Sequence, residues 1–244
     1  MPPVDRIAGI EWKRGAAGFR AMLSEAVCGP ERLIGKPSMS DIDLLVLDRN
    51  VTEAPSADTR FGGLPSADSD VAWPACRECG GNMQFLGQVR LAGARRLHLI
   101  FMCANDPGMC SDWEADGGCN AVIGTGIDGL GIVEAPSEGE VVRGKPYGAR
   151  IEQVQAADYG QARTLWEERH PGREQEVLGF IGGEADWLQG DETPSCDHCG
   201  EPMRFVVQLE EGPDDGSGMN FGGGCGYLFE CDCAGGSGKF LWQS

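Results

Sequence analysis

The sequence predicts an α+β protein that consists mainly of antiparallel β-sheet, with a few short helices and two related halves. First, hydrophobic residues make up 41% of the 244 residues and there are 38 glycines, a composition typical of a folded chain with many turns and short strands. Second, residues 61–89 and 181–209 align without a gap at an offset of 120 residues. Third, apolar residues alternate after the cysteine motif of each aligned segment, which indicates strands.

The aligned segments read FGGLPSADSDVAWPACRECGGNMQFLGQV and IGGEADWLQGDETPSCDHCGEPMRFVVQL. Their identical positions include the glycine pair, the two cysteines and the glycine that follows them. In the first segment the shared residues are Gly62, Gly63, Pro74, Cys76, Cys79, Gly80, Met83, Phe85 and Gln88. Because so many matches fall in one register, they indicate an internal duplication.

A second pair of matching segments follows, LHLIFMC at 97–103 and GYLFEC at 226–231. They align if the second half carries an insertion of eight residues, which lies in the glycine-rich loop before residue 226. Each half is therefore predicted to contain a Gly-Gly segment, a loop, a cysteine knuckle and two strands. We expect one side of each strand to lie in a core, with Met83, Phe85 and Val89 on that side.

Helices are expected at Ala16–Val27 and at Ala156–His170, where apolar residues recur at helical spacing and a Gly-Pro or Pro-Gly pair follows. Residues 48–60 have the composition of a linker. The predicted organisation is an N-terminal helical or extended segment (1–54), a first half with a zinc knuckle (55–150), a linking helix (151–175) and a second half with a zinc knuckle (176–244).

The chain has 11 cysteines, an odd number that a complete disulfide framework cannot use. In the first half, 23 residues separate Cys79 of the Cys76–Cys79 pair from Cys103, and six residues separate Cys103 from Cys110. Zinc takes four soft ligands in a tetrahedral arrangement, and a glycine after the second cysteine permits the sharp turn that a knuckle needs. We predict that these four cysteines bind one zinc ion.

The repeat predicts a second zinc ion on four further cysteines, Cys196, Cys199, Cys231 and Cys233. Only one residue separates the last two, so Cys225 is an alternative fourth ligand. We expect His198, inside the knuckle, to point away from the metal. Both zinc sites are predicted to be structural, because four sulfur ligands leave no open position for water. Cys28, Cys119 and Cys225 are left over and are expected to be free buried thiols.

The formal net charge of the chain is −18. Such a surface repels phosphate backbones, so direct binding of nucleic acid is not expected, whereas a basic protein is an electrostatically suitable partner. Residues 184–215 carry ten acidic side chains and Arg204 as their one basic side chain. This segment is therefore the docking surface that the sequence indicates for a cationic partner.

The first residues, MPPVDRIAGIEWKR, contain no apolar run of signal-peptide length, and the longest aliphatic stretch is Leu44–Leu47. The sequence therefore predicts a cytoplasmic protein with no membrane association. It does not predict an oligomeric state.

The sequence contains no arrangement typical of catalysis. Neither His98 nor His170 has the serine, cysteine and carboxylate neighbours that suggest a nucleophile with its base. There is no G-x-x-x-x-G-K-[ST] phosphate loop. Gln88 and Gln208 end equivalent strands and could contact a ligand, but we expect them to satisfy backbone groups of loops. The chain is predicted not to be an enzyme.

Four tryptophans lie near the repeat units, at positions Trp73, Trp113, Trp187 and Trp242. They could form an aromatic groove for a peptide or pack in the core around the metal sites. Core packing is the expected arrangement.

The order of these motifs resembles a known family. FGGLP, MQFLGQVRL, LGFIGG, WLQGD, FVVQLE and NFGGGCGYLFEC, spread over residues 55–244, are similar to the bacterial YwqG-like family. The two knuckles with their returning cysteines resemble the programmed cell death protein 2 family of eukaryotes. The resemblance implies a duplicated β-rich fold and a role as a dedicated chaperone of a small-subunit ribosomal protein. The chain departs from the eukaryotic pattern because no zinc-finger insert separates its halves.

Three functions are weighed on this basis. The preferred one is a zinc-stabilised protein-binding module, a chaperone or adaptor for a basic protein such as a ribosomal protein. The second is an enzyme, acting in RNA processing or on a small molecule, which requires a pocket with carboxylates of strongly perturbed pKa. The third is an immunity protein that neutralises a basic toxin, which gene neighbourhood would distinguish from the first.

Overall fold

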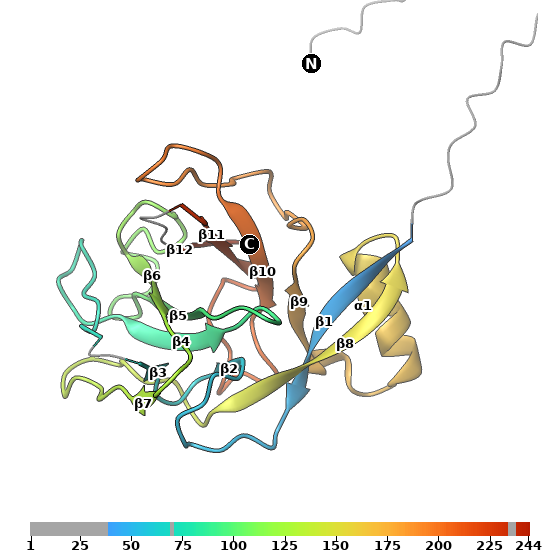
Figure 1. Cartoon of the computed structure of the whole chain (residues 1–244), viewed down its shortest axis with the longest axis horizontal. Coiled ribbons are helices and arrows are strands. Elements are labelled where there is room, and N and C mark those ends of the chain that lie inside the picture. Colours follow the sequence, from blue (N-terminus) through green and yellow to red (C-terminus); the bar gives the residue numbers. More distant parts are fainter. Residues whose placement is uncertain (1–38, 69–70, 234–237) are drawn as a thin grey trace, which may run out of the picture. The chain divides into compact units, whose positions relative to one another are not determined.

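The computed structural model of the protein describes residues 39–68, 71–233 and 238–244. Within these residues, ten strands close into one barrel of antiparallel pairs, and two short strands form a separate sheet (Figure 1). The predicted predominance of antiparallel sheet is confirmed. The helix predicted at Ala16–Val27 lies outside the described residues.

The barrel strands are β1 (Ser40–Asp48), β2 (Arg60–Phe61), β4 (Gln84–Val89), β5 (Leu97–Met102), β6 (Asn120–Thr125), β8 (Tyr147–Ala156), β9 (Val177–Ile181), β10 (Arg204–Glu210), β11 (Cys225–Glu230) and β12 (Gly238–Gln243). Outside the barrel, β3 (Ser66–Ala67) pairs with β7 (Gly131–Ile132). The described residues form one α-helix, α1 (Tyr159–Arg169), and one 3-10 turn, Glu174–Glu176. Neither is long and apolar enough to cross a membrane.

In closing the barrel, the N-terminal and the C-terminal part of the chain each receive one strand from the other. The order of strands around the barrel is β1-β8-β2-β4-β5-β6-β12-β11-β10-β9. The strands β2, β4, β5 and β6 form a first run, and β9, β10, β11 and β12 form a second run. The two runs meet where β6 pairs with β12. β1 precedes the first run in the chain but pairs with β9 of the second. β8 precedes the second run but pairs with β2 of the first. Neither run therefore closes into a barrel by itself.

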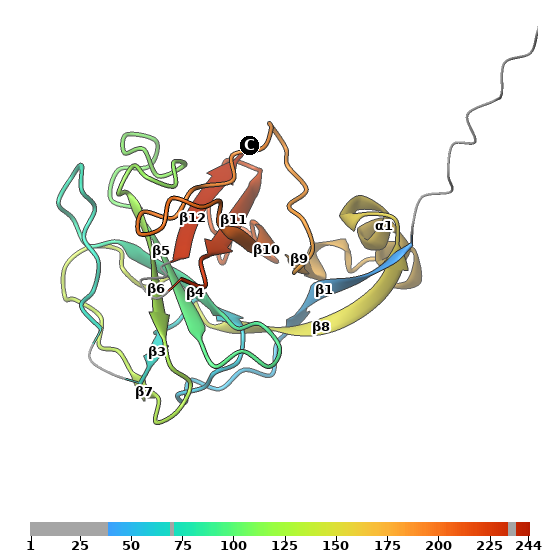
Figure 2. The ribbon, with the colours of Figure 1, turned by 45° about the horizontal axis from the view of Figure 1, so that its top comes forward.

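Both faces of the central strands are buried, so the expectation of one buried face is wrong. In β5, Ile100 and Met102 join the core that fills the barrel, whereas Leu99 and Phe101, which alternate with them, join a cluster on the outside. That outer cluster also contains Cys76 of the first knuckle. The knuckle segments fold back over the strands and bury their outer faces, and Figure 2 shows the segment between β9 and β10 passing over β11 and β12.

Helix α1 confirms the helix predicted near Ala156–His170, with a later start. The carboxylate of Asp158 accepts a hydrogen bond from the Gln161 N–H and caps the helix. Its buried residues are Tyr159, Ala162 and Trp166, which face the β1–β8 pair (Figure 1). Residues 151–156, assigned to the linking helix, are instead the end of β8, because they pair with β1.

The two equivalent glutamines satisfy loop backbone groups, as expected. Gln88 accepts a hydrogen bond from the Ser66 N–H and donates to the carbonyl of Asp58. Gln208 accepts from the Asp186 N–H. Ser66 and Asp186 are themselves 120 residues apart, so each glutamine ties the matching loop to the matching strand.

Candidate metal centres

Each Cys-x-x-Cys segment forms the same tight turn. The Gly80 N–H donates to the Cys76 carbonyl over 2.9 Å, and the Gly200 N–H donates to the Cys196 carbonyl over 2.8 Å. Both glycines have positive φ, 72° and 77°, a conformation that other residues adopt only with strain. The turn directs the two cysteine side chains of each segment to one side, which is the arrangement of a zinc knuckle.

The first group of thiols consists of the four predicted cysteines, Cys76, Cys79, Cys103 and Cys110, whose sulfur atoms all lie within 4.8 Å of one another. The sulfur atoms of Cys79 and Cys103 are 3.7 Å apart. With zinc–sulfur bonds of about 2.3 Å, two sulfur atoms of a tetrahedral site lie about 3.8 Å apart, whereas a disulfide bond is only about 2.05 Å long. The spacing therefore fits a shared metal ion and not a disulfide.

The second group consists of Cys196, Cys199, Cys231 and Cys233, again with all sulfur atoms within 4.8 Å of one another. The sulfur atoms of Cys196 and Cys233 are 3.7 Å apart, and those of Cys199 and Cys231 are 3.6 Å apart. Both distances suit a tetrahedral zinc site. Of the two candidates for the fourth position, the structure brings Cys233 into the group.

Cys225 lies elsewhere, at the start of β11 opposite Glu210. Burial, together with the charge of Glu210, raises the pKa of the Cys225 thiol to about 12. Cys225 is therefore a protonated buried thiol, as expected of a cysteine that does not bind a metal.

In each group, the backbone of the knuckle turn lowers the pKa of one thiol. Burial raises the pKa of Cys76, but hydrogen bonds from the N–H groups of Cys79 and Glu78 outweigh it and lower the pKa to about 7. In Cys196 the corresponding N–H groups of the second knuckle lower the pKa to about 6. Because metal ligands must be thiolates, a low pKa reduces the cost of releasing the proton to the metal.

A neighbouring amide supports the first group. The Asn105 side-chain N–H groups lie 3.5 Å from the Cys79 sulfur and 3.4 Å from the Cys103 sulfur, and also bind the Asn82 carbonyl. Such donors stabilise thiolates and hold the ligands in position. The sequence analysis did not identify Asn105, since it belongs to no matched motif.

A buried lysine lies beside the second knuckle. Lys239 of β12 donates a hydrogen bond of 2.7 Å to Asp197 of the second knuckle. Lys239 also forms an ion pair with Asp116. Burial opposes the charge of the ammonium group, but the two carboxylates outweigh it and raise the pKa of Lys239. The lysine therefore remains charged and links the second knuckle to the loop between β5 and β6.

A fifth thiol lies close to the first group. The Cys119 sulfur is within 4.8 Å of the Cys110 sulfur and of a carboxylate oxygen of Glu78. Burial raises the pKa of Cys119 to about 12, with a further contribution from Cys76. Cys119 is free and buried, as expected, but its position beside the first group was not predicted because it belongs to no repeated segment.

Three of the four tryptophans pack against buried clusters, Trp73 and Trp187 on the outside of the barrel and Trp242 on its inner core, which supports the expected core role. Trp73 meets Phe101 edge-on at 5.3 Å between ring centroids. Trp187 stacks on Tyr227 at 4.6 Å. Trp113 differs, because it is 41% exposed while it contacts Trp242 edge-on.

In the structure, His98 contacts a carboxylate that lies far from it in the chain, so no local motif indicated the contact. His98 Nε2 lies 2.8 Å from a carboxylate oxygen of Glu230, and the two side chains are only 2% and 7% exposed. Glu230 also pairs with Arg204. The hydrogen bond from His98 is the main cause that lowers the pKa of Glu230, against the effect of burial. The pair joins β5 to β11 and so ties the two runs of strands together.

We expect Glu230→Gln to lower the free energy of unfolding by about 2–3 kcal/mol, because it removes the charge from a buried hydrogen-bonded pair. Urea denaturation of the zinc-loaded protein would measure the change. Asp232→Asn is the matched control, since Asp232 also faces Arg204, at 3.8 Å, but its side chain is 80% exposed. Equal losses in the two variants would contradict a structural role for the buried pair.

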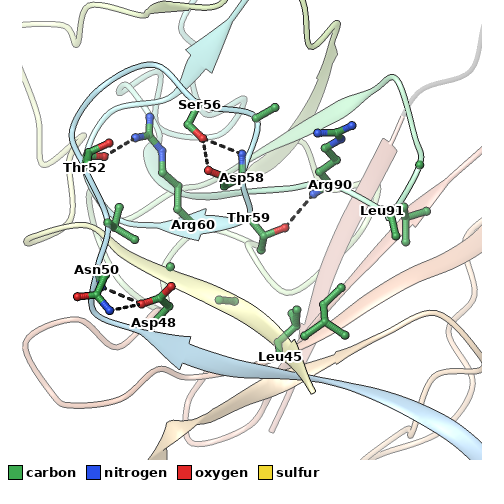
Figure 3. Close-up of a pocket in the computed structure, with 17 residues that line it drawn as sticks. Leu45, Asp48, Asn50, Thr52, Ser56, Asp58, Thr59, Arg60, Arg90 and Leu91 are labelled. Atoms are coloured by element: carbon green, nitrogen blue, oxygen red, sulfur yellow. Dashed lines mark hydrogen bonds between the residues drawn. The ribbon is translucent and has the colours of Figure 1, made fainter. Parts of the chain in front are cut away.

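A cavity of about 710 Å³ opens between β1, β8 and the loop before β2 (Figure 3). Its polar groups bind one another: Asp48 accepts from Asn50, and Ser56 donates to Asp58. Arg60 is buried and donates to backbone carbonyls of the same loop, including that of Thr52. The arginine thus anchors the segment 48–60, and the cysteine groups do not line this cavity.

Comparison with protein-family models and with curated proteins gives no match for this chain.

Proposed function

We propose that each group of four cysteines binds one structural zinc ion. The observation that carries this proposal is the clustering of four sulfur atoms within 4.8 Å in each group, with sulfur–sulfur distances of 3.6–3.7 Å for one pair in the first group and two pairs in the second, which match tetrahedral zinc. The eight ligands are Cys76, Cys79, Cys103, Cys110, Cys196, Cys199, Cys231 and Cys233. Each ion would hold a knuckle segment onto the outer face of the barrel, where the outer clusters contain Cys76 and Cys196.

We also propose that the two runs of strands derive from one duplicated unit. Backbone details that recur at an offset of 120 residues support this. The Gly62 N–H donates to the Leu86 carbonyl, and the Gly182 N–H donates to the Val206 carbonyl. The pairing of β4 with β5 shifts register after Phe85, and that of β10 with β11 shifts at the matching position. The YwqG-like and programmed cell death protein 2 families, to which the motifs are similar, would share such a duplication.

The function that the chain supports best is a protein-binding module, a chaperone or adaptor for a basic protein. The net charge of −18 favours a cationic partner, and each four-thiolate zinc centre adds two negative charges. A ribosomal protein is one partner of suitable charge, as the family resemblance implies. The zinc ions would stabilise the binding surface and take no part in a reaction, because four thiolates fill the coordination sphere.

Affinity capture of the zinc-loaded protein at two salt concentrations tests this function. We expect one dominant basic protein at an ionic strength of about 0.05 M and its loss at about 0.5 M, since salt screens the attraction between exposed charges. Mass spectrometry would identify the partner and its charge. Partners that are acidic, or that remain bound at high salt, would overturn the proposal.

A further inference from the structure

The two Gly-Gly turns of the chain have the same backbone conformation. Gly62 and Gly63 have φ values of 67° and 65°, and Gly182 and Gly183 have φ values of 76° and 75°. Each turn follows a strand of the barrel, β2 in one case and β9 in the other. Their surroundings can therefore be compared atom by atom.

The first turn is covered by a basic segment, residues 142–146, which reads Val-Arg-Gly-Lys-Pro, bends at Gly144 and Lys145, and leads into β8. The Gly63 N–H donates to the Arg143 carbonyl over 3.2 Å. A Cβ atom on Gly62 would lie 2.6 Å from that same carbonyl oxygen, and one on Gly63 would lie 3.1 Å from Pro146. The glycine pair thus permits another backbone to lie directly against it.

The second turn is uncovered within the described residues. A Cβ atom added to Gly182 or Gly183 would meet no described atom within 4 Å. Both glycines line a cavity of about 500 Å³ between the start of β1, the start of α1 and the segment after β9. Among the described residues, no segment covers this turn in the way that residues 142–146 cover the first.

The cavity has the charge opposite to that of the covering segment. Its carboxylates are Asp41, Asp43, Asp158, Glu184 and Asp186, and no arginine or lysine stands among its described lining residues. Ile42, Tyr159 and Phe180 provide apolar surface between them. Burial, and next the charge of Asp158, raises the pKa of Asp186, as expected where carboxylates gather without a cation.

We propose that this cavity binds an Arg- and Lys-containing segment of the partner protein, in the way that residues 142–146 cover the first turn. The proposal rests on the proposed function and names the surface that performs it. The Gly183 N–H donates to a carbonyl of the bound segment, as Gly63 does to Arg143. The basic side chains of the segment pair with the carboxylates, and the apolar surface contacts their aliphatic stems.

A peptide with the sequence of residues 140–147, Glu-Val-Val-Arg-Gly-Lys-Pro-Tyr, is the probe. Its binding to the full-length, zinc-loaded protein is measured by fluorescence anisotropy at low salt. The variant Asp41→Asn/Asp186→Asn is expected to weaken binding by about 10-fold or more, a loss of about 1.4 kcal/mol. The control Glu138→Gln/Glu140→Gln removes the same charge from exposed positions outside this cavity and outside residues 184–215, and is expected to bind like the wild type.

Carbodiimide cross-linking, which joins a lysine amine to a carboxylate, locates the peptide. Cross-links from the peptide lysine to Asp41 or Asp186 support the proposal. Cross-links from Lys36 of the chain to the same carboxylates would overturn it, because Gly-Lys-Pro also stands at residues 35–37 and the cavity would then belong to the chain's own segment. Equal peptide binding by the cavity variant and the control would overturn it as well.

The capture experiment distinguishes a failure of the proposed function from a failure of the assignment to this cavity. If the cavity variant still captures a basic protein in a salt-sensitive manner, the proposed function holds and the assignment to this cavity fails. If the wild type captures no such protein, the proposed function itself fails. A cavity variant that loses both the peptide and the captured protein, while it melts like the wild type, supports both.

Discussion

Replacing Cys76 with serine is expected to lower the zinc content from two ions per chain to one and to destabilise the protein severely. A structural zinc ion contributes on the order of 10 kcal/mol to folding, which is comparable with the whole stability of a domain, about 5–15 kcal/mol. Because β1 and β8 are exchanged between the two runs of strands, the loss at the first knuckle cannot remain local. We therefore expect one transition at a much lower temperature, in place of two separate ones.

Native mass spectrometry would count the zinc ions, and circular dichroism would follow the melting. Cys225→Ser is the matched control, because Cys225 is a buried thiol that belongs to neither four-cysteine group. It should retain two zinc ions and lose only about 1–2 kcal/mol from burying a hydroxyl. If Cys76→Ser keeps both its metal content and its melting temperature, Cys76 is not a ligand.

Gly179→Ala is expected to lower the free energy of unfolding by more than about 3 kcal/mol, because the backbone of two barrel strands would have to move apart. Gly179 lies in β9, has a φ of 130°, and a Cβ atom there would stand 1.9 Å from the Gln208 carbonyl oxygen of β10. The contact is with backbone, so no rotation of a side chain can relieve it. The positive φ adds to the cost, since L-residues adopt this conformation only with strain.

Urea denaturation of the zinc-loaded variant would measure this loss. Gly131→Ala in β7 serves as the control, since a Cβ atom at Gly131 would meet nothing within 4 Å and its φ is not positive. We expect that control to stay within about 0.5 kcal/mol of the wild type. Similar losses in the two variants would show that the β9–β10 spacing is not critical.

Much of the candidate metal site could be predicted from the sequence, because a knuckle is a local structure. A Cys-x-x-Cys pair followed by glycine forms its turn from neighbouring residues, and the repeat then indicated where the returning cysteines stand. The choice between Cys225 and Cys233 was left open, since both stand near the returning strand. It depended on the path of the chain after β11, which brings the Cys233 sulfur within 3.7 Å of the Cys196 sulfur.

The burial of the strands is a feature that the alternation of apolar residues predicted only in part. Alternation in MQFLGQV correctly predicted a strand at β4 but indicated a single buried face. Met83 and Phe85 of the predicted face pack in the outer cluster with Cys76, whereas Leu86 and Val89 fill the barrel. Gln88 is buried as well, because it bonds with backbone groups of the loop before β4. Alternation reports the polarity of side chains, and a polar side chain that is hydrogen-bonded can be buried as fully as an apolar one.

The mainly antiparallel sheet, the helix α1 and the two sets of cysteines could be predicted from the chain alone, because each depends on the periodicity or spacing of residues close together in the sequence. Long-range pairing sets the remaining features: β1 and β8 exchange places, His98 meets Glu230 across 132 residues, and one Gly-Gly turn is covered while the other lines a cavity. These features depend on which distant segments pair when the barrel closes. Local patterns do not encode that choice, because many pairings satisfy the same alternation of apolar and polar residues.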